Sequence, residues 1–264
     1  MTTAPVRSVF TEIIMDLPFS LHIRGTEPRQ AIEAAVREVW SDLRAADETF
    51  SPFKPTSAVS RMNRGEECPA ADSAAVNAVL DLAHQTYRIT DGAFDVHYSG
   101  QLDPSGIVKS WATARAAKRL DHLDVVYYLN AGGDILVRTA ASTPRWRIGI
   151  EHPHDPNLLL AVLELTSGGI ATSGSAHRGN HIIAGRTGRP ASGFTQVSVV
   201  GPSLVKADIA ATTLMVTGAP NPALSRWLRG YEVLAVSTTA QLLATPGLAE
   251  LAVDTLPAHR ILDL

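Results

Sequence analysis

Asp208 and Thr212 are the two side chains whose chemical types and spacing best suit a metal ion. They lie four residues apart in a segment with helical periodicity, so both project from one face of the expected helix. A carboxylate and a hydroxyl are hard oxygen ligands, which suit Mg²⁺ better than zinc; two of them fit an ion that keeps waters and shares itself with substrate phosphates. The spacing also has an ordinary structural interpretation, because an aspartate near a helix start can cap the helix and a helical threonine can bond back to its own backbone.

Two glycine-containing segments are further candidates for contact with a polar ligand. Residues 90–95 read Thr-Asp-Gly-Ala-Phe-Asp, which suits either ligand binding or an ordinary Asp-Gly turn. Residues 103–109 read Asp-Pro-Ser-Gly-Ile-Val-Lys and lead from a loop into a helix, whose first N–H groups can hold a phosphate while Lys109 adds positive charge. The alternative is a plain helix start with a solvated lysine, and the spacing is not that of a P-loop.

His181 is the candidate general base. It ends a loop and precedes a basic stretch at 186–190, so it could act on a proton near phosphates, although a lone histidine is more often structural. Residues 130–134 read Asn-Ala-Gly-Gly-Asp. They lack the full glycine fingerprint of a dinucleotide-binding loop and are typical of a tight hairpin turn.

The elements that would position these residues alternate irregularly between helix and strand. Residue 72 is an aspartate that could cap the second helix, residues 51–71 are expected to be irregular, and Gly218 is well placed to end the fourth helix. Helices are expected at 28–46, 72–87, 107–120 and 203–217, with a short one starting at Gln241, and strands at 19–23, 125–129, 135–139, 146–150, 159–165, 170–172, 196–200 and 231–237. This order predicts an α+β fold with mostly antiparallel strands, and the whole chain, 1–264, is expected to form one domain.

Composition narrows the classes of function. The 264 residues are 45% hydrophobic, enough for a sizeable core, and a net charge of -3 argues against a nucleic acid partner. One cysteine excludes an internal disulfide and a multi-cysteine metal site. No window is apolar enough to span a membrane and the N-terminus has no apolar signal region, so a cytoplasmic protein is expected.

The order of the short motifs along the chain is more informative than any one of them. Taken together, the series resembles the ApbE family over about 15–218, and its most specific parts are Gly-Ala-Phe-Asp, Asn-Ala-Gly-Gly-Asp and the final Asp-x-x-x-Thr. The motifs are Phe-Ser-Pro-Phe at 50–53, Ser-Ala-Val-Ser-Arg-Met-Asn at 57–63, and the segments at 92–95, 103–109, 130–134, 173–175, 181–183, 187–190 and 208–212.

This resemblance implies a fold and a reaction. The fold would be α+β, ApbE-like, with two similar β-α-β halves and mostly antiparallel sheets around a central flavin site. FAD would be bound between the halves with Mg²⁺ at its pyrophosphate. A threonine or serine hydroxyl of a target protein would attack, so that FMN is transferred as a phosphoester and AMP leaves; charge neutralisation and positioning carry such a phosphoryl transfer.

The resemblance also assigns roles to individual positions. His181 would be the catalytic base. Asp208 and Thr212 would bind Mg²⁺ through their side chains, and the backbone carbonyls of Gly106 and Ala211 would complete the shell. The residues implied to bind the flavin nucleotide are Ala93, Phe94, Asp95, Asp103, Lys109 and Ile183.

The sequence departs from the family pattern at several places. Asp16 stands where the family usually has glycine, Ser110 follows Lys109 where glycine is usual, and Ala184-Gly185 replace an Asp-Pro pair beside the proposed base. These changes leave the metal pair intact. Two alternatives to transfer therefore stay open: an FAD pyrophosphatase that releases FMN and AMP, and a non-catalytic FAD-binding or carrier protein.

Overall fold

A computed structural model describes residues 6–139, 144–174, 193–257 and 259–264. Nine strands form one sheet in the order β1-β2-β3-β4-β7-β8-β9-β10-β11, antiparallel throughout except for the parallel pair β10 and β11, and β5 and β6 form a separate antiparallel pair. The strands are β1 (Val6–Ile14), β2 (Leu17–Gly25), β3 (Val125–Ala131), β4 (Asp134–Arg138), β5 (Trp146–His152), β6 (Asp155–Leu165), β7 (Ser167–Gly174), β8 (Gln196–Gly201), β9 (Glu232–Val236), β10 (Leu242–Ala244) and β11 (Arg260–Ile261). The structure confirms the mixed, mostly antiparallel fold.

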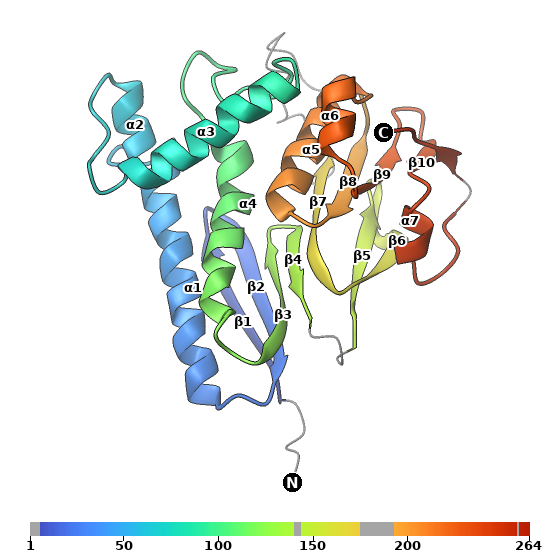
Figure 1. Ribbon diagram of the computed structural model, residues 1–264, viewed down its shortest axis with the longest axis horizontal. Helices are drawn as coiled ribbons and strands as arrows, with labels where there is room; N and C mark the ends of the chain where they lie inside the picture. The colour runs from blue at the N-terminus through green and yellow to red at the C-terminus, as the bar shows by residue number, and fades with distance from the viewer. Residues whose placement is uncertain (1–5, 140–143, 175–192, 258) are drawn as a thin grey trace.

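The long helices cover one face of the large sheet. Figure 1 shows α1, α4 and α5 side by side across it, with α3 crossing the upper ends of α1 and α4 and reaching α6. The helices are α1 (Arg29–Phe50), α2 (Ala58–Asn63), α3 (Ser73–Ile89), α4 (Ser105–Ala116) with the 3-10 turn η1 (Ala117–Leu120), α5 (Leu204–Thr217), α6 (Pro222–Trp227) and α7 (Leu248–Leu251).

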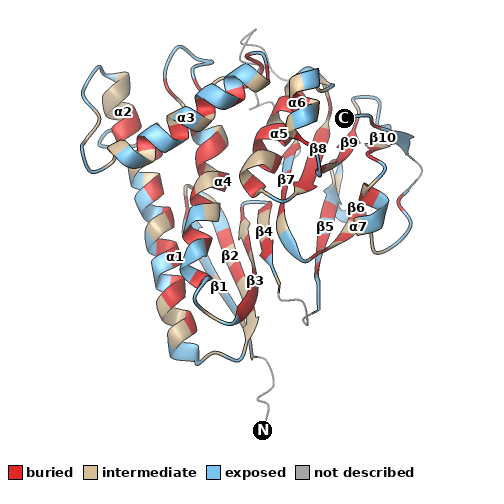
Figure 2. Cartoon of the chain, in the orientation of Figure 1, coloured by how far each residue is buried: buried red, intermediate tan, exposed pale blue. Residues whose placement is uncertain are grey.

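Alternation along the strands gives the sheet two apolar faces. On β3, Tyr127 and Leu129 pack beneath the helices, whereas Val126 packs on the opposite face against the β5–β6 pair. On the helix side the core divides in two: one cluster joins the N-terminal strands to α1, α3 and α4, and the other joins β7, β8 and β9 to α5 and α6. The two parts meet where α4 contacts α5. Figure 2 shows the buried residues gathered along these inner faces.

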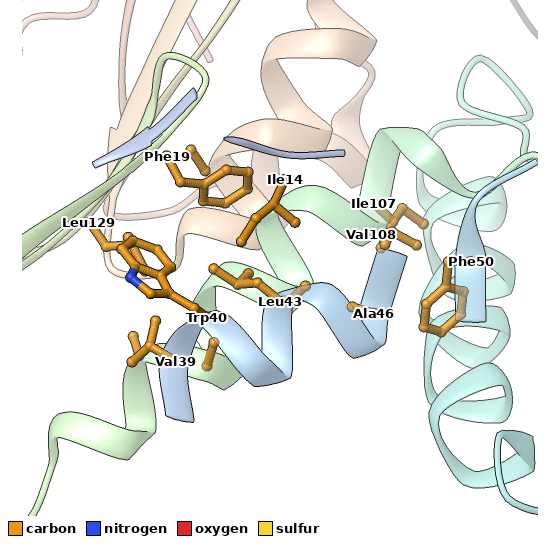
Figure 3. Close-up of a cluster of buried hydrophobic side chains, with 14 of the residues drawn as sticks. Ile14, Phe19, Val39, Trp40, Leu43, Ala46, Phe50, Ile107, Val108 and Leu129 are labelled. Atoms are coloured by element: carbon orange, nitrogen blue, oxygen red, sulfur yellow. The ribbon is translucent and has the colours of Figure 1, made fainter. Parts of the chain in front are cut away.

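Helix α1 anchors the N-terminal cluster through one apolar stripe. Val39 and Leu43 are fully buried, and in Figure 3 they lie with Trp40 on the side of α1 that faces the sheet. Farther along the same helix, Ala46 and Phe50 approach α4 at Ile107 and Val108. The stripe therefore fixes the C-terminal end of α1 next to the beginning of α4.

Leu43→Ala tests this packing. Because Leu43 is 0% exposed, its truncation leaves a cavity, and the free energy of unfolding should fall by about 2–5 kcal/mol. Urea denaturation followed by circular dichroism measures the change. Ser41→Ala on the exposed face of α1 is the control and should change stability by about 0.5 kcal/mol or less. Equal losses of unfolding free energy in both variants would contradict the burial of Leu43.

The structure confirms the four long predicted helices and corrects two local details. The expected helix at Gln241 is wrong: residues 242–244 form β10, which pairs with β9 across a turn in which Gln241 N–H donates to Ser237 Oγ at 3.0 Å. Asp72 precedes α3 but its side chain makes no capping bond; its Oδ1 instead accepts from Thr49 Oγ1 at 2.9 Å. Five further elements were not predicted from the sequence: β1, α2, α6, α7 and β11.

Candidate functional site

A cavity of about 430 Å³ opens between the two halves of the helix-side core. Its volume falls within the range of small-molecule sites. Its walls come from the β1–β2 turn, the end of α1 and the segment after it, residues 93–98, the beginning of α4, the end of β7 and the middle of α5. Segments far apart in the sequence thus meet at one place, and most of the predicted site residues line it.

Helix α5 carries the predicted metal pair into this cavity. The helix begins at Ser203, whose side chain accepts the Lys206 N–H, and it ends at Gly218, which has a left-handed φ of 72°. Both Asp208 and Thr212 line the cavity, and Asp208 is only 6% exposed. The Thr212 hydroxyl lies 3.1 Å from the hydroxyl of Ser173 at the end of β7.

The ordinary structural roles on α5 belong to other residues. Ser203 caps the helix, so Asp208 does not. The back-bonded threonines are Thr213, which donates to Ile209 O at 2.7 Å, and Thr217, which donates to Thr213 O at 3.1 Å. Asp208 and Thr212 therefore place oxygen atoms at the cavity rather than serving the helix itself.

The first turn of α4 also faces the cavity. It has no side-chain cap, and Ser105, Gly106 and Lys109 line the wall. Just before it, Asp103 accepts the Ser105 N–H at 3.1 Å and the Tyr98 hydroxyl at 3.0 Å. The partial positive charge of a helix N-terminus favours an anion at this wall.

Gly106 marks a close approach in this turn. A methyl group added there would lie 3.2 Å from the Phe94 ring. Glycine thus lets the Phe94 ring pack directly on the first turn of α4. Burial, and next the charge of Asp103, raise the pKa of Tyr98, so its phenol stays protonated and donates to that carboxylate.

Lys109 is not the solvated lysine of an ordinary helix start. Its ammonium forms an ion pair with the Asp134 carboxylate, and the two side chains are 18% and 2% exposed. Asp134 also accepts the Thr172 N–H at 3.2 Å, so it ties Lys109 to β7. The motifs at 103–109 and 130–134 therefore act together at one wall. The glycines of the latter form the predicted hairpin turn between β3 and β4.

The segment after α3 first makes a turn and then forms part of the cavity wall. Asp91 and Gly92 have positive φ values of 52° and 74°, as an Asp-Gly turn requires. Ala93, Phe94 and Asp95 then line the cavity, the first two of them buried. The Asp-Gly turn is therefore confirmed, and the residues after it lie where a ligand in the cavity would contact them.

Asp16 lies in the tight turn of the β1–β2 hairpin at the cavity rim. Met15 and Asp16 have φ values of 55° and 56°, which is the left-handed region where glycine, asparagine and aspartate are favoured. Aspartate thus satisfies the backbone of this turn without glycine. Ser110 is likewise accommodated, because its buried hydroxyl donates to Ile107 O at 3.1 Å.

Not every predicted site residue is placed at the cavity. Ala211 is fully buried in α5 and is not among the lining residues. His181 and Ile183, together with the altered Ala184-Gly185, lie outside the described residues. Asp103, Gly106 and Lys109 line the wall as expected.

Several lining residues were not predicted from the sequence. Ser173 lines the cavity and Asp134 lies behind its wall. Both belong to motifs in the series above, but their contacts to Thr212 and Lys109 join distant segments. Tyr98 carries no motif signal of its own. Phe53, which is 87% exposed at the cavity mouth, could have been suspected from its place in Phe-Ser-Pro-Phe.

The described part of the chain lacks two features that would indicate other kinds of protein. There, no three histidine, cysteine or acidic side chains gather as metal ligands, so a metal in this region would rest on fewer such residues. In the same residues, no helix has the length and apolar character needed to cross a membrane.

Comparisons with known proteins point in one direction. The model of the ApbE family matches residues 15–100 and 97–235. An FAD:protein FMN transferase of Rhodobacter capsulatus is 32% identical over 127 residues, which is 45% of this chain but only 24% of that protein. An FAD:protein FMN transferase of Chlamydia trachomatis serovar D is 24% identical over 284 residues, covering 84% of this chain and 88% of its own.

Solved structures show the same fold. The flavin transferase ApbE of Vibrio cholerae superposes with a TM-score of 0.76 at 19% identity, covering 94% of this chain and 99% of its own. The apo form of the flavinyl transferase ApbE of Pseudomonas stutzeri gives 0.76 at 24% identity, covering 94% and 97%.

Proposed function

The chain belongs to the ApbE family, and we propose that it is a flavin transferase that moves the FMN moiety of FAD onto a threonine or serine hydroxyl of a target protein and releases AMP. The observation that carries the proposal is the single cavity in which the Asp208–Thr212 pair, the first turn of α4 and residues 93–95 come together. These are an oxygen ligand pair, an anion-binding helix end and a partly apolar wall, as a flavin pyrophosphate requires.

We assign the phosphate-binding role to α4. Its N-terminal end, at Ser105 and Gly106, lines the cavity and carries the positive partial charge of the helix dipole, and Lys109, held by Asp134, brings an ammonium group to the same wall. Asp103 shapes the loop before the helix by accepting from Ser105 and Tyr98. Ala93, Phe94 and Asp95 supply the wall for the flavin nucleotide, and Ile183 is assigned to the same site by its motif.

The donor set fits Mg²⁺. A carboxylate and a hydroxyl at one face of α5 are hard oxygen donors, and so are the backbone carbonyls of Gly106 and Ala211 that we assign to the same ion. When bound, Mg²⁺ would neutralise phosphate charge at the pyrophosphate. Asp208 is nearly buried, which strengthens its electrostatic interaction with a cation.

The chemical step exchanges one phosphoester partner for another. The acceptor hydroxyl attacks the phosphorus on the FMN side, a new O–P bond forms, the P–O bond of the pyrophosphate breaks, and AMP leaves with the bridging oxygen. His181 is proposed to take the hydroxyl proton. The described residues would contribute charge and position: Lys109 and the N-terminal end of α4 would hold phosphate oxygens, and Asp208 and Thr212 would hold the cation.

Incubation of the purified protein with FAD, MgCl₂ and a panel of peptides tests the proposal; the peptides carry Asp-x-x-Ser-Gly-Ala-Thr, the kind of acceptor sequence that the resemblance to the ApbE family implies. Intact-mass spectrometry should show a peptide heavier by one FMN less one water, with one AMP released per transfer. A matched peptide with Ala in place of the final Thr is the control and should gain nothing. Stoichiometric FMN and AMP without a labelled peptide would instead identify a pyrophosphatase, and bound but unconverted FAD would identify a carrier.

A further inference from the structure

Strand β1 ends the nine-stranded sheet at an edge with an unusual amount of exposed aliphatic surface. It runs for nine residues in unbroken register with β2 and contains no proline. Its two charged residues are Arg7, near its beginning, and Glu12, which forms an ion pair with Arg44 of α1. Val9 is 57% exposed and Ile13 is 70% exposed, and both lie on the sheet face opposite α1. Long, flat, apolar edges pair with other strands unless a charge, a proline or a bulge blocks them.

The hairpin turn settles which backbone groups of β1 face outward. Met15 and Asp16 form a two-residue turn, so Ile14 and Leu17 flank it as a hydrogen-bonded pair. Hydrogen-bonded pairs alternate along an antiparallel ladder. The N–H and C=O groups of residues 7, 9, 11 and 13 therefore point away from β2, and no backbone hydrogen bond from another described segment reaches them.

We propose that this edge pairs with β1 of a second copy of the chain, antiparallel and about a two-fold axis at Thr11. In a dimer with a two-fold axis, the same edge of both copies forms the interface, so the chain needs no second binding surface. With Thr11 opposite itself, Val9 of one copy faces Ile13 of the other, twice over. Those are the two exposed aliphatic side chains of the strand, and aliphatic cross-strand pairs stabilise antiparallel sheets.

Neighbouring registers match less well. An axis at Phe10 would set Ile13 against Arg7 and Val9 against Thr11. An axis at Val9 would set Thr11 against Arg7 and leave Ile13 without an aliphatic partner on β1 of the other copy. In the Thr11 register, residues whose N–H and C=O groups face outward lie opposite one another, as hydrogen bonding between the two β1 strands requires. The register also sets no two like charges opposite each other.

The first experiment measures mass without FAD or Mg²⁺, so its outcome is independent of catalysis. Light scattering on a sizing column should give twice 28.1 kDa for the chain. Ile13→Lys should raise the dimer dissociation constant at least tenfold, because a lysine would face Val9 of the other copy. Leu158→Lys, at a leucine on β6 that is 55% exposed, is the matched control and should leave the constant unchanged. A monomer at every concentration, or equal loss in both variants, would overturn the proposal.

The second experiment tests the register. In a Cys68→Ser background, Thr11→Cys should be linked to its copy by a short bis-maleimide in high yield. Arg7→Cys should not be, because the same register places the two Arg7 positions eight residues apart, or about 27 Å. Equal linking of both cysteines, or linking of Arg7→Cys alone, would rule out the Thr11 axis.

Discussion

Asp208→Asn should lower the rate of flavin transfer by about a hundredfold or more, at FAD concentrations that saturate the wild-type enzyme. The substitution keeps the size of the side chain but removes the negative charge that we assign to the cation. The residue is 6% exposed, so solvent does little to screen the lost interaction. Initial rates of AMP release measured across a series of MgCl₂ concentrations provide the readout.

The dependence of the rate on MgCl₂ concentration distinguishes a metal ligand from a residue that only supports the fold. If Asp208 holds the cation, Asp208→Asn should shift the Mg²⁺ midpoint to higher concentration while the circular dichroism spectrum stays that of the wild type. Thr212→Ala should shift the midpoint in the same direction by a smaller factor. Thr217→Ala, in which a back-bonded threonine of the same helix is lost, should leave it unchanged. An unchanged midpoint in Asp208→Asn would remove this residue from the proposed metal site.

The sequence predicts the parts of the site that depend on a single helix or strand, and not the parts that depend on contacts between elements. Helix α5 was predictable because its capping serine and terminal glycine bracket a largely apolar segment, and spacing alone then puts Asp208 and Thr212 on one face. The contact between Thr212 and Ser173 was not predictable, since it joins α5 to β7 and depends on how the two pack. Periodicity describes one element at a time and carries no information on which elements meet.

The elements that were not predicted correctly from the sequence escaped prediction for different physical reasons. On β1 the face toward the core includes Ser8 and Glu12, while Val9 and Ile13 point outward, so the alternation that marks a half-buried strand is absent. Helices α2 and α6 are six residues each, too short for a periodic signal. At residues 242–244 the leucines favour helix intrinsically, but pairing with β9 decides the structure.

Asp134→Asn should raise the KM for FAD about tenfold and change kcat much less. Asp134 is buried and lies behind Lys109 rather than at the substrate, so we regard it as a positioning residue that holds the ammonium against the phosphate wall. An asparagine keeps the acceptor for the Thr172 N–H but loses the charge that pairs with Lys109. Steady-state kinetics with varied FAD, and FAD binding followed by flavin fluorescence, measure the effect.

A double-mutant cycle shows whether the effect passes through Lys109. Lys109→Ala alone should raise the KM more than Asp134→Asn does, because it removes the phosphate contact itself. In the Lys109→Ala background, Asp134→Asn should then add little, since the side chain that it positions is gone. Asp121→Asn, which breaks the exposed ion pair with Arg138, controls for loss of an acidic partner and should leave the KM unchanged. If the two substitutions raise the KM for FAD additively, Asp134 acts on the site by another route. If Asp134→Asn adds nothing in the Lys109→Ala background, Asp134 acts on the KM by orienting Lys109.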